Sequence, residues 1–205
     1  MSSAETPAPR KRPVQARSAI TVDAILTAAA HILEGEGMEG YTTNAIAARA
    51  GVSIGSLYQY FPNKEAITAA LVLADAERLY EGLQAASDGS AGAPFLARLE
   101  ALLDVVIAHQ MERPVLARMI DMEERRLAHD PALQAVHEAG FALVRQELQD
   151  SGLSLPFGLE ASTVDVFAIV LGICDTAGER GETDGDGLKA RIRHAVLSYL
   201  GLRPS

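Results

Sequence analysis

The chain has 205 residues, which suggests one or two domains, and it is long enough to bury a full core. It is 48% apolar but only 5% aromatic, with no tryptophan, a composition that favours an all-α fold. The single cysteine, Cys174, excludes an intramolecular disulfide, and the net charge of −9 argues against unspecific binding to nucleic acids.

The basic charge is gathered near the N-terminus. Residues 1–64 hold six Lys/Arg and five acidic residues, whereas residues 65–205 hold twelve and twenty-two. Residues 1–17 combine three prolines with Arg10, Lys11, Arg12 and Arg17, and we expect them to form a disordered arm. Such an arm is either a solvated tail or a segment whose basic side chains reach phosphates or a DNA minor groove.

Residues 18–63 have the pattern of three short helices. The first should begin at Ser18 or Thr21 and end at Gly35–Gly37, with an apolar stripe at Ile25, Ala28, Ala29 and Ile32. Thr43 should cap a second helix, which Gly51 ends. Ser53 should cap a third helix over Ile54–Tyr60, and Phe61-Pro62 stops it. Two helices around a glycine turn form a helix-turn-helix, whose second helix can enter a DNA major groove.

The Ile54–Tyr60 helix is unusual in what it leaves outside. We expect Ile54 and Leu57 to face the core together with Phe61. The remaining side chains, Ser56, Tyr58, Gln59 and Tyr60, suit contacts to sugar, phosphate and thymine methyl groups. The alternative is that the two tyrosines pack against the next helix.

A longer helical region follows. Asn63 should cap a helix over residues 64–86, which links the first domain to the rest of the chain. Apolar periodicity, proline starts and glycine-rich loops then predict helices over residues 95–110, 115–128, 131–150, 160–179 and 188–200. We therefore expect about nine helices in three parts: a basic arm (1–17), a helix-turn-helix domain (18–63) and a helical domain (64–205).

The helix over residues 160–179 is apolar almost all round, so we expect one face to meet its own core and the other a second subunit. Its longest uninterrupted apolar run, Val166 to Cys174, is too short to span a bilayer. The N-terminus also lacks the apolar stretch of a signal peptide, and the expected location is the cytoplasm.

Residue patterns for catalysis, cofactors and metals are absent from the sequence, so we expect no enzyme activity. His109 and Glu112 have the i, i+3 spacing of a metal-ligand pair, but no second pair supports them. Asp175 continues an apolar stripe, and there it either binds an effector or pairs with an arginine across a dimer interface. Candidate ligand-binding residues on the helices around a central cavity are His109, Met119, Met122, Phe141, Phe167 and Asp175.

The segment from Ala47 to Glu65 carries a resemblance. After Ala47 it contains the turn Ala50-Gly51-Val52-Ser53, followed by Gly55-Ser56-Leu57-Tyr58, Tyr60-Phe61 and Asn63-Lys64-Glu65. This pattern resembles the DNA-binding domain of the TetR family of transcriptional regulators, over about Thr21 to Leu71. The rest of the chain resembles that family only in the number and order of its helices.

The resemblance implies an all-α homodimer that joins through the helices over residues 160–179 and 188–200. It also implies that a small-molecule effector in the body acts through the 64–86 helix and releases double-stranded operator DNA. By position in the motif, the DNA-contacting residues would be Thr43, Asn44, Ser53, Gly55, Ser56, Tyr58, Tyr60 and Lys64, and Arg17 in the arm would join them.

The sequence thus predicts a ligand-responsive transcriptional regulator, most simply a repressor of a palindromic operator. The first alternative is a regulator or architectural DNA-binding protein without an effector, against which the acidic body argues. The second is an enzyme with its active site in the helical body, which would need a constellation that the sequence lacks.

Overall fold

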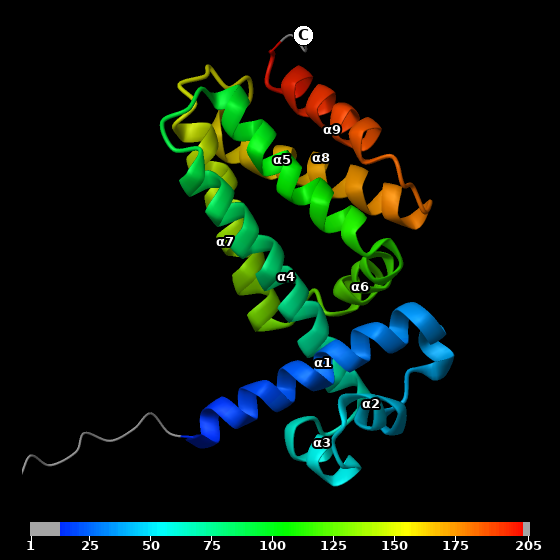
Figure 1. The fold of residues 1–205 in the computed structure, drawn as a ribbon. Coiled ribbons are helices and arrows are strands. Elements are labelled where there is room, and N and C mark those ends of the chain that lie inside the picture. The colour runs from blue at the N-terminus through cyan, green and yellow to red at the C-terminus, as the bar shows by residue number, and fades with distance from the viewer. Residues whose placement is uncertain (1–12, 203–205) are drawn as a thin grey trace, which may run out of the picture. The chain divides into compact units, whose positions relative to one another are not determined.

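The computed structural model describes residues 13–202, and the side chains of residues 18–202 (Figure 1). The described part is all-α, as the composition predicts: it contains nine helices, and no strand lies within residues 13–202. The chain divides into two compact units, Met1–Thr68 and Ala69–Ser205. Helix α4 (Lys64–Gly89) begins in the first unit and continues without a break into the second.

The first unit contains α1 (Pro13–Gly40), α2 (Thr43–Ala50), α3 (Ile54–Tyr60) and the first turn of α4. Helix α2 packs against α1 on one side and α3 on the other. Burial of apolar side chains from every helix holds the unit together. Its fully buried residues include Ile25, Ile32, Tyr41, Ile46, Leu57 and Ile67.

The turn between α2 and α3 forms as its residues require. Gly51 ends α2 with a φ of 69°, a left-handed conformation that glycine adopts without steric cost. The Ser53 hydroxyl then accepts a hydrogen bond of 3.0 Å from the Ser56 backbone N–H and caps α3. Asn63 caps α4 in the same way, through a 2.8 Å bond from the Ala66 N–H to its side-chain oxygen.

Three details of the first unit differ from the sequence prediction. The cap of α2 is Thr42, whose hydroxyl accepts from the Ala45 N–H at 3.2 Å, and Thr43 is already the first helical residue. Helix α1 begins at Pro13, so residues 13–17 of the expected disordered arm are helical. The range of α1 runs on to Gly40, but Gly37 is non-helical (φ 65°, ψ −163°) and kinks the chain, so the first helical stretch ends there as predicted and a short second one follows it.

The second unit holds the remainder of α4 and five further helices. These are α5 (Phe95–Glu112), α6 (Pro114–Arg126), α7 (Pro131–Gln149), α8 (Gly158–Glu179) and α9 (Gly185–Tyr199). Proline at N1 starts α6 and α7, and the Asp130 carboxylate caps α7. The boundaries lie within about three residues of the predicted ones, as is usual for helix ends.

Helix α8 lies at the centre of this unit. It packs against α5, α6, α7 and α9, and Figure 1 shows α5 and α9 running alongside it. The core beneath these helices is apolar and includes Leu103, Leu148, Val166, Leu188, Ile192 and Val196. Its burial stabilises the unit independently of the first one, because each buried aliphatic side chain contributes roughly 1.5–3 kcal/mol.

Candidate nucleic-acid interface and ligand cavity

Helix α3 exposes an unusual set of side chains. Leu57 and the following Phe61 are buried as predicted, and Tyr58 and Tyr60 are exposed, with Tyr58 half uncovered at 50%. The prediction for Ile54 was wrong: its side chain is 38% exposed, because the first residue of this two-turn helix lies beyond the reach of the core. The outward face of α3 therefore combines tyrosine, glutamine and serine with one aliphatic residue.

Two short hydrogen-bond links order this face. The hydroxyls of Thr43 and Tyr58 lie 3.2 Å apart and join the start of α2 to the middle of α3. The hydroxyls of Ser53 and Ser56 lie 2.8 Å apart at the start of α3. Hydroxyl groups held this way present both donors and acceptors to a partner, which suits phosphate and base-edge contacts.

The other predicted DNA-contacting residues surround this face. Asn44 is exposed on the first turn of α2, and exposed Gly55 would carry a Cβ with 3.9 Å to its nearest neighbour, the Ser53 hydroxyl. A side chain would fit at this position, so internal packing does not require glycine there. Because Gly55 has no side chain, a DNA backbone could approach α3 closely at this point. Lys64 is half-buried, with its ammonium 5.8 Å from the centre of the Tyr41 ring. The side chain of Arg17 lies outside the described residues.

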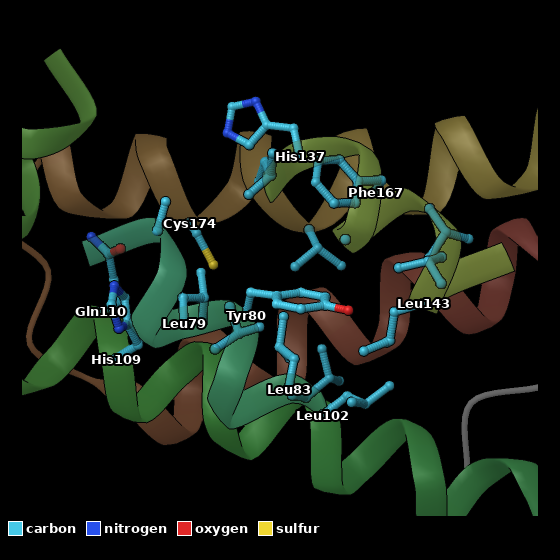
Figure 2. A pocket seen from close by; sticks show the side chains of 18 of the residues that line it. Leu79, Tyr80, Leu83, Leu102, His109, Gln110, His137, Leu143, Phe167 and Cys174 are labelled. Carbon is cyan, nitrogen blue, oxygen red and sulfur yellow. The ribbon is translucent and has the colours of Figure 1, made fainter. Parts of the chain in front are cut away.

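The second unit contains a cavity of about 410 Å³ among its helices. That volume lies in the range of roughly 300–1,000 Å³ typical of small-molecule sites. Helix α4 supplies one wall through Asp75, Ala76, Leu79, Tyr80 and Leu83, and the ring of Tyr80 projects toward the middle (Figure 2). The remaining walls come from α5, α6, α7, α8 and α9.

One end of the cavity is apolar. Figure 2 shows Leu83, Leu102 and Leu143 at this end. Glu147, one turn beyond Leu143, also lines the cavity, but its carboxylate is fully engaged. It accepts 2.7 Å and 2.5 Å hydrogen bonds from the Arg98 Nε and the Ser87 hydroxyl, so this buried pair is compensated.

The opposite end, where Figure 2 places His109 and Gln110, is polar and acidic. Four carboxylates line the cavity there, and three of them have a basic side chain as a partner. Asp75 contacts His109 at 2.9 Å, Glu124 contacts His137 at 2.6 Å, and Asp175 contacts Arg125 at 3.5 Å. Asp175 therefore has an arginine partner, but on α6 of its own chain rather than across a dimer interface.

The fourth carboxylate, Asp121, is different. Its Oδ2 atom is buried and has no hydrogen-bond partner within the described residues, and the same holds for the Gln110 Nε2 atom. Burial, together with the negative charges of Asp175, Glu124 and Asp75, raises the pKa of Asp121 to about 7. The adjacent Gln110 amide opposes part of that rise, although the two side chains do not meet in hydrogen-bond geometry.

The charges of the other pairs follow from their contacts. Burial opposes ionisation of Asp75, but hydrogen bonds and charges from His109 and Arg78 outweigh it and lower the pKa of that carboxyl. The hydrogen bond to Glu124 raises the pKa of His137. Burial raises the pKa of the Cys174 thiol to about 12, so this cavity-lining cysteine is an inert apolar group rather than a nucleophile.

The six predicted ligand-binding residues separate into two groups. His109, Phe167 and Asp175 line the cavity. Phe141 lies behind the wall, with its ring stacked on Phe167 at 4.1 Å between ring centres. Met119 and Met122 are not among the cavity-lining residues, and Met122 is exposed because it lies on the outer side of α6.

Sequence reasoning missed the central polar residues of the cavity, Asp75, Gln110 and Asp121. Two of them had a visible signal. Asp75 interrupts the apolar i, i+4 series from Leu71 to Leu79, and Gln110 continues the series of Leu103 and Ile107 on α5. A polar residue in an apolar stripe at helical spacing is directed inward, as Asp175 is on α8.

His109 and Glu112, which have the i, i+3 spacing of a metal-ligand pair, each contact a different side chain. His109 bonds Asp75 and Glu112 bonds Arg78, and the described residues hold no group of three metal-ligating side chains.

Helix α8 exposes an apolar stripe. Val164 is 54% and Leu171 37% exposed, and Ala161, Ala168 and Gly172 lie at helical spacing beside them. With 22 residues, α8 is also long and apolar enough to cross a membrane by length and composition, although its longest uninterrupted apolar run is shorter. The core helix of a soluble protein passes the same test, and α8 packs against four helices of its own unit.

The comparison with protein families identifies the first unit. Residues 25–71 match the model of bacterial regulatory proteins of the tetR family. They comprise most of α1, all of α2 and α3, and the start of α4. No curated protein matches the sequence.

Solved structures share the fold along nearly the whole chain. A putative TetR-family transcriptional regulator from Mesorhizobium loti is 23% identical with a TM-score of 0.70, and the match covers 90% of this chain and 97% of that one. The fatty acid degradation regulator FadR from Bacillus halodurans is 18% identical with a TM-score of 0.75, over 95% and 100%. FadR from Bacillus subtilis in complex with stearoyl-CoA is 18% identical with a TM-score of 0.71, over 86% and 98%.

Residues 25–71, which include the helix-turn-helix of α2 and α3, thus match the DNA-binding domain of tetR-family regulatory proteins. The chain as a whole shares the fold of TetR-family regulators.

Proposed function

We propose that the protein is a ligand-responsive repressor, which a small-molecule effector releases from a palindromic operator. The observation that carries this proposal is the course of helix α4. It begins directly after the helix-turn-helix and then contributes five residues to the wall of the cavity. A ligand that contacts α4 therefore contacts the helix that enters the DNA-binding unit, and it can favour one state of that helix over another.

The exposed face of α2 and α3 is the proposed operator contact. Tyr58, Tyr60 and Ser56 on α3 would meet base edges and the DNA backbone, and Asn44 would suit adenine. The DNA phosphates would be contacted or closely approached by Thr43, Ser53, Gly55 and Lys64. Arg17 would contact the DNA from the N-terminal arm. The acidic second unit favours release, because it keeps unspecific attraction to DNA low.

A homodimer through α8 and α9 is the proposed assembly. The exposed stripe of α8 is apolar and has small residues, Ala168 and Gly172, which allow a second helix to approach closely. Exposed apolar stripes of this kind mark protein–protein contacts more often than solvated surface. A twofold dimer presents two α3 helices to two half-sites, so its operator should be palindromic. Burial of α8 in a dimer also fits a cytoplasmic protein.

The lining of the cavity indicates an effector with an apolar body and one polar group. Leucine, valine and phenylalanine side chains dominate, and the polar residues gather at one end. The FadR complex with stearoyl-CoA shows that a relative of this fold carries a ligand with a long apolar chain. A regulator without any effector is the second candidate, but a cavity of this size, shared with α4, favours the first.

Operator binding in the presence of a ligand tests the proposal. The operator would be found by footprinting genomic fragments with the purified protein. Its affinity would then be measured by fluorescence anisotropy with decylamine, decanol or decyl sulfate, which share one chain and differ in the charge of the head group. We expect at least one of them to weaken operator binding about tenfold or more, a coupling of at least roughly 1.4 kcal/mol.

Two variants of α4 serve as a matched pair. Ala76→Phe places a large ring at the wall of the cavity and should abolish the response while preserving operator affinity. Glu77→Gln changes the neighbouring exposed residue and should respond like the unmodified protein. If a compound binds the protein in calorimetry but leaves operator affinity unchanged, ligand-responsive repression is excluded for that compound and a regulator without an effector is favoured.

A further inference from the structure

The polar end of the cavity has an excess of one buried carboxylate. Asp75, Glu124 and Asp175 each have a basic side chain beside them, but Asp121 has none in the part of the chain that the structure describes. A buried charge without a partner is costly, so folding alone does not explain a carboxylate at this place.

The Gln110 amide, next to Asp121, is a second polar group at this end without a hydrogen-bond partner in the described residues. This side chain lines the cavity and is only 7% exposed, yet its Nε2 atom has no hydrogen-bond partner among the described residues. Buried amides are nearly always hydrogen-bonded, and an orphaned one lowers the stability of the fold. Gln110 can present either N–H donors or its oxygen acceptor to a partner, and with the oxygen turned inward it would serve a donor.

The Gly178 backbone on α8 lies beside both of these groups. A Cβ on this residue would come within 2.5 Å of the Gln110 Nε2 atom and 3.4 Å of the Asp121 Oδ2 atom, so the Gln110 amide occupies the place that a side chain would need. The two orphaned atoms therefore lie close to one another, and both residues line the cavity. A single ligand group in the cavity beside them can reach both.

We propose that Gln110 and Asp121 bind the positively charged, N–H-donating head of an amphipathic amine whose carbon chain lies along the leucine-lined end of the cavity. This assignment rests on the proposed function, because it names the chemistry of the effector for the same cavity. An ammonium group supplies a positive charge and an N–H donor for the Asp121 Oδ2 atom, and a second N–H donor for the Gln110 oxygen once that amide is rotated to turn its oxygen toward the cavity. An anionic head would instead face four carboxylates, with a strong electrostatic cost.

Binding affinity on the full-length protein without DNA tests this inference separately from repression. Isothermal titration calorimetry would compare decylamine, which is protonated at neutral pH, with decanol and decyl sulfate. At pH 8 we expect decylamine to bind with one site per chain and at least tenfold more tightly than either of the others. Equal or tighter binding of decanol or decyl sulfate overturns the assignment, as does a failure of decylamine to bind.

Matched variants then locate the head group. Asp121→Asn removes the charge with little change of shape and should weaken decylamine binding at least tenfold while leaving decanol unaffected. Glu123→Gln removes a surface carboxylate of the same helix, paired with Arg126, and should change neither. Melting curves of the ligand-free variants establish that each one is folded. The comparison of the three compounds on the unmodified protein does not depend on any variant. An equal loss for decanol and decylamine in Asp121→Asn would overturn the assignment.

Proton release gives another measurement. The groups that surround Asp121 are Asp75, Glu124, Asp175, His109, Arg125 and His137. Since the pKa of Asp121 lies at about 7, most of its population is protonated at pH 6, and a bound ammonium should expel that proton. Titrations at pH 6 in two buffers of different ionisation enthalpy should show this release, and Asp121→Asn should reduce it. Undiminished release in Asp121→Asn would contradict the assignment and point to His137.

The repression assay separates the two proposals. Tight binding of decylamine through Asp121 without any change in operator affinity would support the amine site and contradict ligand-responsive repression. Operator release by decanol or decyl sulfate, with decylamine inactive, would support repression and overturn the amine site.

Discussion

The two units of the chain place their candidate sites in opposite ways. In the first unit, the exposed face of α2 and α3 comes from residues 43–64, which are neighbours in sequence. In the second unit, the cavity draws on α4 to α9, with lining residues from Asp75 to Val196. A face built from consecutive residues depends on caps and turns, whereas a cavity built from six helices depends on their packing. Variants should therefore separate the two sites.

The largest expected effect comes from Leu171→Asp in the second unit. If the α8 stripe joins two protomers, a buried aspartate there should weaken the dimer by roughly 2–5 kcal/mol, about 30- to 5,000-fold. Operator affinity should fall with it, although the first unit is unchanged. Sedimentation measures the dimer, and anisotropy measures operator binding.

Met122→Asp is the matched control for that variant. Met122 is an exposed apolar residue of the same unit, but it lies on α6, outside the proposed interface. It should remain dimeric. An intact Leu171→Asp dimer would show that α8 does not form the interface and would leave the two units less coupled than proposed.

Tyr58→Ala tests the first unit alone. Loss of an exposed ring and of its hydroxyl link to Thr43 should reduce operator affinity by roughly 30- to 100-fold, or about 2–3 kcal/mol, without changing helix content or dimer formation. Decylamine binding in the second unit should be unaffected. Tyr58→Phe retains the ring, so a smaller loss there isolates the hydroxyl. Unchanged operator affinity in Tyr58→Ala would remove this residue from the DNA contact.

Lys64→Gln should have a more modest effect. A phosphate contact contributes equally on every DNA sequence, so the variant should weaken specific and unspecific binding alike and reduce the slope of log affinity against log salt by about one. Lys189→Gln in the second unit, where the ammonium pairs with Glu100 and Asp104, should leave that slope unchanged. A loss confined to one operator sequence would assign Lys64 to base recognition instead.

The smallest expected effect concerns the stability of the second unit. The pKa of Asp121 is about 7 in the fold and near 3.8 in the unfolded chain, so the fold favours its protonated form. Stability from this group is present at low pH and is lost as pH rises from about 4 to above 7. Asp121→Asn should therefore melt a few degrees above the unmodified protein at pH 8 and close to it at pH 5.

Thermal unfolding at the two pH values measures this difference. The hydrogen bond to Glu124 raises the pKa of His137, but this pair is present in both proteins, so its contribution cancels in the comparison. If both proteins lose the same stability between pH 5 and pH 8, Asp121 is not the group responsible.

Local sequence signals explain what could be predicted. Gly51, Ser53 and Asn63 end or begin helices through their own backbone and side-chain chemistry, so the helix-turn-helix follows from the sequence alone. Proline starts did the same for α6 and α7. The errors there were small: Thr42 rather than Thr43 caps α2, since either threonine could accept the bond, and Ile54 lies outside.

The cavity was harder to predict because periodicity gives the direction of a side chain only within its own helix. The pattern identified Asp175 as inward, but not that Arg125, fifty residues earlier, would lie 3.5 Å from it. It also could not show that Met119 and Met122 lie off the cavity while Asp121, between them, lines it. Those relations depend on how α6 packs against α8, which no local signal encodes.

The uninterrupted course of α4 also bears on how the chain folds. Starting a helix is costly, whereas extending one is cheap, so either unit that has formed its part of α4 lowers the barrier for the other. We expect the two units to unfold in one cooperative transition rather than as two independent domains joined by a flexible linker. A fragment cut at the unit boundary, after Thr68, would retain only the first five residues of α4, too few to remain helical alone. A cut after Gly89 would preserve the whole helix.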